Sequence, residues 1–438
     1  MKRGSRRMAA LLALVGAGMV LAAAPGLEAQ EVPDSVTLEE ALARALERSP
    51  TLAQSLAAVE NAVSGRRTAV GAFLPNISSS SGASVSSTRR FDPATQREVE
   101  GSATSYSASL SASYDLFDGF RNVRELTVAG ADLEAAEARR ESQRFDVVLQ
   151  TKTTFFSALR QGELLTVQQS RVRRANESLD NIRRRVQLGS ATRSDSLRAR
   201  LELANARQAE LQARSALRAA EFALGRAIGA DGPVAPATPG GLESGPLPLS
   251  DDEIYRVAVD ASPDVVAAVA EERAALASVG SARAAYFPSL SVSSGLTWNN
   301  DIAAFSDGNS SWNVRFSASY PIFNRFQRST VVDRAQAAAR VSRLARSDAE
   351  LRARESADGA LQTLRTAEEA IEIANEAVVV AAEDLRVVEE RYRLGVATIL
   401  DLITSQIAVE EAEANQVFAR YDYLLARAQL ESILGREL

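Results

Sequence analysis

The chain contains two copies of one pattern, and this internal duplication constrains its fold more than any single residue does. Short landmarks recur in the same order in both halves, at nearly constant separation. Because both copies must solve the same packing problem, each is expected to form the same elements. The landmark pairs are Ser49-Pro50 with Ser262-Pro263, Leu74-Pro75 with Phe287-Pro288, Phe117 with Phe323, and Leu188-Gly189 with Leu394-Gly395.

The first residues are typical of an export signal. Lys2 and Arg3 precede an apolar run from Met8 to Ala24, and small residues near Ala29 suit cleavage. The apolar run is shorter than the ~20 residues of a spanning helix, so a single membrane anchor is the less favoured alternative. The sequence therefore predicts a signal peptide over residues 1–29 and a mature chain without a transmembrane helix.

Composition excludes several classes of function. The chain has no cysteine and no histidine, which removes disulfides, cysteine nucleophiles, Ser-His-Asp triads and nearly every transition-metal site. The net charge of −6 argues against a nucleic-acid partner. Arginine runs such as Arg183-Arg184-Arg185 are interpreted as solvated helix faces. We therefore expect no catalytic residue, no cofactor, no metal site and no nucleic-acid partner.

Each half is predicted to begin with two helices and to continue with two strands. Pro75 and Pro288 end the second helix of each copy, because proline removes an amide donor and disfavours helix in the residue before it. After each proline the apolar residues recur with a period of two. The predicted strands cover about 76–88, 103–115, 289–299 and 312–322.

The alternation gives each strand an apolar face and a small polar face. Leu110 and Tyr114, for example, alternate with serines. Each strand is close to the 9 to 11 residues that a tilted strand needs to cross a bilayer, and polar loops at 89–102 and 300–311 are expected to join the pairs. Four strands leave two costly unpaired edges in hydrocarbon, so several copies must pool their strands into one barrel. The pattern leaves barrels of eight, twelve or sixteen strands open.

Helical periodicity returns after the strands. Single helices are predicted over about 120–187 and 326–393, with apolar residues in a heptad seam. Gly189 and Gly395 break these helices, and a further helix follows each break to form a tight hairpin.

This organisation divides the chain into four parts. After the signal peptide, the first structural repeat covers residues 30–228 and the second covers 251–438. A Gly- and Pro-rich linker at 229–250 separates the repeats.

The combination of these features resembles the TolC-like outer membrane efflux proteins. The resemblance rests on the duplicated helix-strand-strand-helix-helix plan, on the segment Tyr320 to Asn324, and on Arg391 to Gly395 followed by Thr398 and Asp401. The resemblance implies a mainly α fold with a membrane β-barrel portion. It implies a homotrimer whose 12-stranded β-barrel lies among outer membrane lipids and continues into a long periplasmic α-helical barrel.

The resemblance also implies a function. The chain would be the outer membrane channel of a tripartite efflux or type I secretion system, with a periplasmic adaptor (membrane fusion) protein and an inner-membrane pump as partners. Drugs, metal ions and secreted polypeptides all remain open as cargo. The hairpin tips are expected to be closed at rest and to dock the adaptor through Leu188, Gly189, Ser190, Leu394, Gly395 and Val396.

Three residues match gate positions of that family. Asp401 matches an acid of a constriction ring, and Asp195 and Tyr392 match a pair that holds the closed tip together by a hydrogen bond. Ala397 stands where the best-known members have a latching arginine, and Thr404 stands where they have a second ring acid. We therefore expect a looser gate. The alternative role for both acids is stabilisation of a helix start, worth ~0.3–1 kcal/mol.

Two other functional classes remain as alternatives. An exported coiled-coil scaffold without channel activity would explain the heptads but not the strands. A hydrolase with paired carboxylates could use Asp251-Asp252, although these acids lie where a helix start is predicted.

Overall fold

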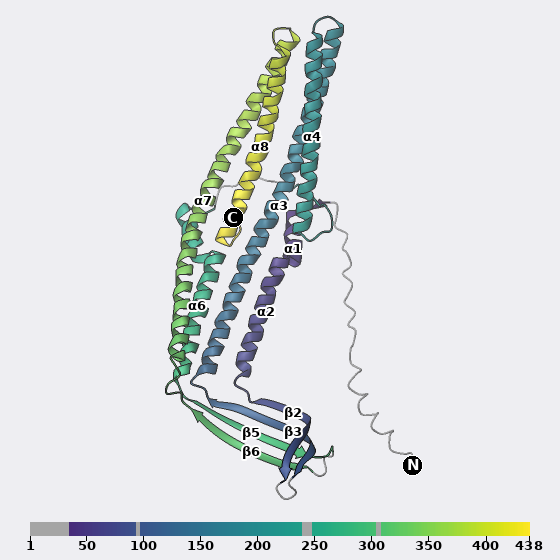
Figure 1. The fold of residues 1–438 in the computed structure, drawn as a ribbon. Helices are drawn as coiled ribbons and strands as arrows, with labels where there is room; N and C mark the ends of the chain where they lie inside the picture. Colours follow the sequence, from purple (N-terminus) through teal and green to yellow (C-terminus); the bar gives the residue numbers. More distant parts are fainter. Residues whose placement is uncertain (1–34, 93–96, 239–247, 304–307) are drawn as a thin grey trace, which may run out of the picture.

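The protein is an elongated molecule with a sheet at one end and two helical hairpin turns at the other (Figure 1). The computed structural model describes residues 35–92, 97–238, 248–303 and 308–438, so the expected signal peptide lies outside the described residues. Two helices connect the ends, α3 (Arg121–Gln187) and α7 (Gln327–Arg393), each of 67 residues. At 1.5 Å per residue, each is about 100 Å long.

The remaining helices occupy equivalent places in the two repeats. Each repeat has a short helix, a helix that leads toward the sheet, and a helix that returns from the tip. The first repeat contributes α1 (Leu38–Arg48), α2 (Pro50–Gly71) and α4 (Arg193–Ala227), and the second contributes α5 (Asp251–Ala261), α6 (Pro263–Arg283) and α8 (Ile399–Leu434). A 3-10 turn, η1 (Ala284–Tyr286), ends α6, and the parallel pair β1 (Ser35–Val36) and β4 (Ala235–Pro236) brings part of the expected linker against the start of α1.

The two repeats share one antiparallel sheet in the order β2-β3-β5-β6. Each repeat contributes one hairpin, and β3 of the first pairs with β5 of the second. Strands β2 and β6 therefore form the two edges. The bounds are β2 (Asn76–Asp92), β3 (Arg97–Phe117), β5 (Ser289–Asn300) and β6 (Asn309–Ser319).

Three strands differ in extent from the sequence prediction. The loop expected at 89–102 is largely strand, because the β2-β3 ladder continues to the pair Asp92 and Arg97. Backbone pairing needs no apolar alternation, which is why the side-chain pattern missed it. Strand β6 ends at Ser319 rather than residue 322, where Pro321 has no amide for the ladder.

The register sorts the strand side chains into an apolar face and a hydroxyl face. Leu110, Leu296 and Trp312 form one apolar row across three strands, and all three are exposed. On the opposite face, serine hydroxyls of β2 and β3 bond across the ladder, as in the 2.8 Å pair of Ser78 and Ser111. An exposed apolar face of this breadth suits a nonpolar environment, and the hydroxyl face suits water.

Apolar clusters hold the helices together at three levels. One surrounds Phe155 and Tyr421 where α1 and α4 meet α3. A second surrounds Ile254 and Leu430, where α5 meets α7 and α8. The third contains the predicted heptad seam of the hairpins, including Leu179 of α3. In the part of the chain that the structure describes, no helix is both long and apolar enough to cross a membrane.

Candidate functional site

Both hairpin tips turn at a glycine in the left-handed region. Gly189 has φ +74° and Gly395 has φ +79°, and a Cβ at either position would meet no atom within 4 Å. Backbone conformation rather than space therefore selects glycine. In the second tip, the Val396 amide donates to the Arg391 carbonyl at 2.9 Å, and the Ser190 amide makes the equivalent bond to Arg185 at 2.8 Å. These bonds satisfy carbonyls that the helix ends would leave free.

The predicted docking residues lie at the surface of these tips. All six residues are exposed, and the large apolar side chains among them are exposed over most of their surface. Leu188 is 81% exposed, Leu394 is 73% exposed and Val396 is 64% exposed. Exposed leucines at the end of the two long hairpins form an apolar surface suited to a protein partner.

The helix that follows each tip begins with a capping box. The Asp401 amide donates to Thr398 Oγ1 at 3.2 Å, and the Thr398 amide donates to Asp401 Oδ2 at 2.8 Å. Thr192 and Asp195 make the equivalent pair of bonds at 2.9 and 3.2 Å. The helix-start role weighed for both acids is therefore present in the structure. Hydrogen bonds from the Thr398 amide and hydroxyl lower the pKa of exposed Asp401.

The Tyr392 hydroxyl does not make the hydrogen bond to Asp195 that the resemblance predicted. It is buried and has no hydrogen-bond partner among the described residues, while the Asp195 carboxylate is held by the Thr192 cap. Burial raises the pKa of Tyr392, the Arg185 cation opposes this, and the Asp195 charge adds to it. The Tyr392 phenol therefore stays neutral near pH 7.

Arg185 connects the two tips. Its Nη1 donates to the Tyr392 carbonyl at 2.6 Å, and its guanidinium carbon lies 4.7 Å from the centre of the Tyr392 ring. Its Nη2 also donates to the Ser190 carbonyl at 3.4 Å. Interpreting the whole run Arg183-Arg184-Arg185 as a solvated face was therefore wrong for Arg185. The sequence carried no signal for this contact, because the partner is about 200 residues away.

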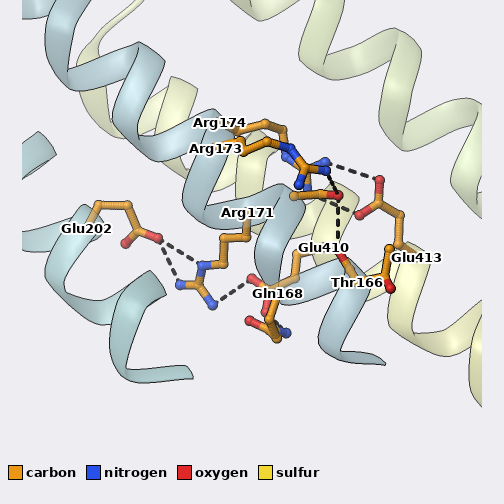
Figure 2. Close-up of polar contacts among 9 residues, drawn as sticks. Thr166, Gln168, Arg171, Arg173, Arg174, Glu202, Glu410 and Glu413 are labelled. Carbon is orange, nitrogen blue, oxygen red and sulfur yellow. Dashed lines mark hydrogen bonds and ion pairs between the residues drawn. The ribbon is translucent and has the colours of Figure 1, made fainter. Parts of the chain in front are cut away.

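A second polar cluster joins the two repeats between the tips and the middle of the molecule (Figure 2). Arg171 of α3 lies between Glu202 of α4, at 2.8 Å, and Glu410 of α8, at 2.7 Å. Arg174 adds an ion pair to Glu413 of α8 at 3.0 Å. These side chains are mostly buried, and Arg171 is 19% exposed. The α3-α8 and α3-α4 contacts therefore have an ionic component beside the apolar cluster that both hairpins share.

The charge of Asp195 acts on Tyr392, but no hydrogen bond joins these two expected gate residues in the described structure. Tyr392 lies against Arg185 beside the first tip, whereas Asp401 caps its own helix and faces solvent. Sequence reasoning missed Arg171, Arg185 and Glu410. Their charges looked like any solvated helix charge until the fold placed the helices side by side.

Comparison with known proteins agrees with this architecture. A model of the family described as "Outer membrane efflux protein" matches residues 41–230 and 254–436, and its two segments coincide closely with the two repeats. The chain is 26% identical over 366 residues to the probable efflux pump outer membrane protein TtgC of Pseudomonas putida, covering 81% of this chain and 74% of that protein.

Two solved structures have the same fold. The outer membrane protein VceC of Vibrio cholerae aligns with a TM-score of 0.74 at 18% identity, covering 91% of this chain and 96% of that one. The MtrE outer membrane channel of Neisseria gonorrhoeae, solved in its open state, aligns with a TM-score of 0.76 at 23% identity, covering 91% and 89%. With the family match spanning most of both repeats, these results establish that the chain belongs to the outer membrane efflux protein family.

Proposed function

We propose that the protein is the outer membrane channel of a tripartite efflux or type I secretion system, passing solutes from the periplasm or a pump to the exterior. The observation that carries the proposal is the amphipathic four-stranded sheet at the end of two helices of about 100 Å. A coiled-coil scaffold would leave this sheet without a role. The relatives are named as efflux channels rather than enzymes, so we infer no catalytic activity.

The proposed assembly is a homotrimer. Strands β2 and β6 each have one unpaired edge among the described residues, and an unpaired backbone group in hydrocarbon costs several kcal/mol. Three copies supply twelve strands, and closure removes every edge. The apolar face then contacts outer membrane lipid, the hydroxyl face lines water, and the helices form a tube in the periplasm. Export to that membrane requires the signal peptide proposed over residues 1–29.

The proposed gate and docking surface lie at the periplasmic end. The exposed Leu188, Leu394 and Val396 suit contact with a periplasmic adaptor, which would connect the channel to an inner-membrane pump. At rest, Arg185 would hold the two hairpins of each chain together. Asp401 from three chains would contribute negative charge near the narrowest point.

Two adjacent substitutions on opposite faces test the proposal. Leu110→Arg places a charge on the apolar face, whereas Ser109→Arg places the same charge on the hydroxyl face. A lipid-facing arginine costs about 2–4 kcal/mol at the bilayer midplane. We expect the wild type and Ser109→Arg to form heat-modifiable trimers that conduct in planar bilayers, and cross-linking to stop at three chains.

Leu110→Arg is expected to lose membrane insertion. A water-soluble monodisperse monomer for the wild type, or equal assembly of both variants, would contradict the proposal.

A further inference from the structure

Few of the strand side chains that the structure describes are charged, and the register places these on defined faces. Among strand residues whose side chains the structure describes, the charged ones are Arg89, Asp115 and Arg315. Asp115 and Arg315 lie on the hydroxyl face, since Arg315 is aligned with Ser293 and Ser113. Arg89 lies on the apolar face, four residues after Val85. Among the described side chains, one acid and one base therefore lie on a face of hydroxyls and amides.

The acid and the base are separated by one strand. Asp115 is in β3, Arg315 is in β6, and β5 lies between them. Neighbouring strands are ~4.8 Å apart, and Asp115 is aligned through Ser291 with Ser317, two residues from Arg315. The two charged positions are therefore roughly 12 Å apart. Both side chains are exposed, and no ion pair joins them in the described structure. Each charge is thus available to the water on this face.

Closing the sheet with further copies repeats this spacing. In the trimer of the proposed function, β6 of one copy lies beside β2 of the next, so Arg315 is also two strands from the next copy's Asp115. Three copies then place six charges of alternating sign around the lumen at equal steps. We propose that Asp115 and Arg315 form an alternating ring that removes charge selectivity from the strand portion, so that cationic and anionic solutes both pass.

Removing the charges of one sign should make the lumen selective for ions attracted by the remaining charges. Arg315→Gln leaves three carboxylates facing the lumen, and Asp115→Asn leaves three guanidinium groups, so the variants should select ions of opposite sign. The lumen is wide and water-filled, so the effect depends on screening. The Debye length is ~30 Å at 0.01 M salt and ~3 Å at 1 M. Selectivity should therefore appear at low salt and vanish at high salt.

The test is the reversal potential of purified trimers in planar bilayers under a KCl gradient near 10 mM. We expect Arg315→Gln to shift the permeability ratio about twofold toward potassium and Asp115→Asn to shift it about twofold toward chloride. The double variant should return to the wild-type ratio. Arg89→Gln makes the same charge change on the apolar face and should leave the ratio unchanged.

The proposal is overturned if both single variants keep the wild-type ratio in conducting trimers, or if Arg89→Gln shifts it as far as Arg315→Gln. If the wild-type trimers conduct but the variants keep the wild-type permeability ratio, the ring is excluded and the proposed channel still stands. Wild-type trimers without conductance overturn the channel and the ring together.

Discussion

The guanidinium of Arg185 lies over the ring of Tyr392 and donates a 2.6 Å hydrogen bond to the Tyr392 carbonyl. The contact joins the last turn of α3 in one repeat to the last turn of α7 in the other. A cation beside the carbonyls at a helix C-terminus is favourable. The arginine that contacts Tyr392 comes from α3, and residue 397 is alanine.

Loss of the Arg185 side chain should loosen the closed tip. We expect Arg185→Ala to raise the resting conductance of trimers in planar bilayers, because the hydrogen bond and the ring contact are both lost. Arg185→Lys should have a smaller effect, since lysine keeps the charge but not the planar donors. Arg183→Ala is the control, because in the described part of the chain Arg183 pairs with Asp180 of its own helix. Equal conductance in all variants would exclude a latch at Arg185.

Tyr392→Phe should leave the resting conductance unchanged. The hydroxyl is buried and has no hydrogen-bond partner in the described structure, so its removal breaks no bond there and relieves an unsatisfied group. We expect the free energy of unfolding to stay the same or rise by about 1 kcal/mol. Tyr392→Ala removes the ring beneath Arg185 and should raise the conductance. A conductance increase in Tyr392→Phe would instead indicate a hydroxyl bond that forms in the assembled trimer.

Substitution of Gly395 should impair efflux without disturbing the barrel. At the φ of +79° that Gly395 adopts, any other residue costs about 1–2 kcal/mol. A β-branched residue adopts this conformation least readily. We expect Gly395→Val to abolish efflux while heat-modifiable trimers persist. Gly395→Asn is the matched control, because asparagine tolerates this conformation. Resistance of cells to an effluxed compound measures the result, and full efflux in Gly395→Val would exclude the tip as a docking surface.

Asp401 should control block by multivalent cations. Asp401→Asn is expected to weaken block in planar bilayers, because it removes three negative charges from the trimer. Hydrogen bonds from Thr398 lower the pKa of Asp401, so the carboxylate stays charged below the ordinary range near pH 3.9. Block of the wild type should therefore persist to pH 4 and weaken only below it. If block of the wild type is lost near pH 6, or if Asp401→Asn is blocked as strongly as the wild type, the cations bind to groups other than Asp401.

Arg171 should contribute to stability more than an exposed arginine does. Arg171→Ala leaves Glu202 and Glu410 close together and mostly buried, without their shared cation. We expect a loss of about 2 kcal/mol, below the full cost of breaking a completely buried pair. Arg183→Ala breaks an exposed pair and should cost less than about 1 kcal/mol. Thermal unfolding followed by helical circular dichroism compares the two, and equal losses would contradict a special role for Arg171.

The main elements were predictable because their signals are local. Helix ends follow from Pro75, from glycines at tips, and from threonine caps whose partner is three residues away. Strand faces follow from alternation. The extent of β2 and β3 was not predictable from alternation, because the ladder continues to the pair Asp92 and Arg97 where the sequence no longer alternates.

The candidate site was predictable only in part. The glycines and capping residues lie within a few positions of their partners and could be placed from sequence. The contact of Arg185 with Tyr392 could not, because it depends on how two hairpins from different repeats pack. The resemblance predicted Tyr392 as a gate residue, and among the described residues its hydroxyl has no hydrogen-bond partner while Asp195 caps its own helix.

By itself, the sequence determined the duplication, the order of helices and strands, and the two faces of the sheet, because each depends on periodicity or on neighbours a few residues apart. Only the tertiary structure decided that both repeats share one sheet, that β2 and β6 are its edges, and that Arg171 and Arg185 join the repeats. These contacts form between residues far apart in the chain. Periodicity specifies which face of an element is apolar. Tertiary packing decides which other element that face contacts and which partner a charged side chain pairs with.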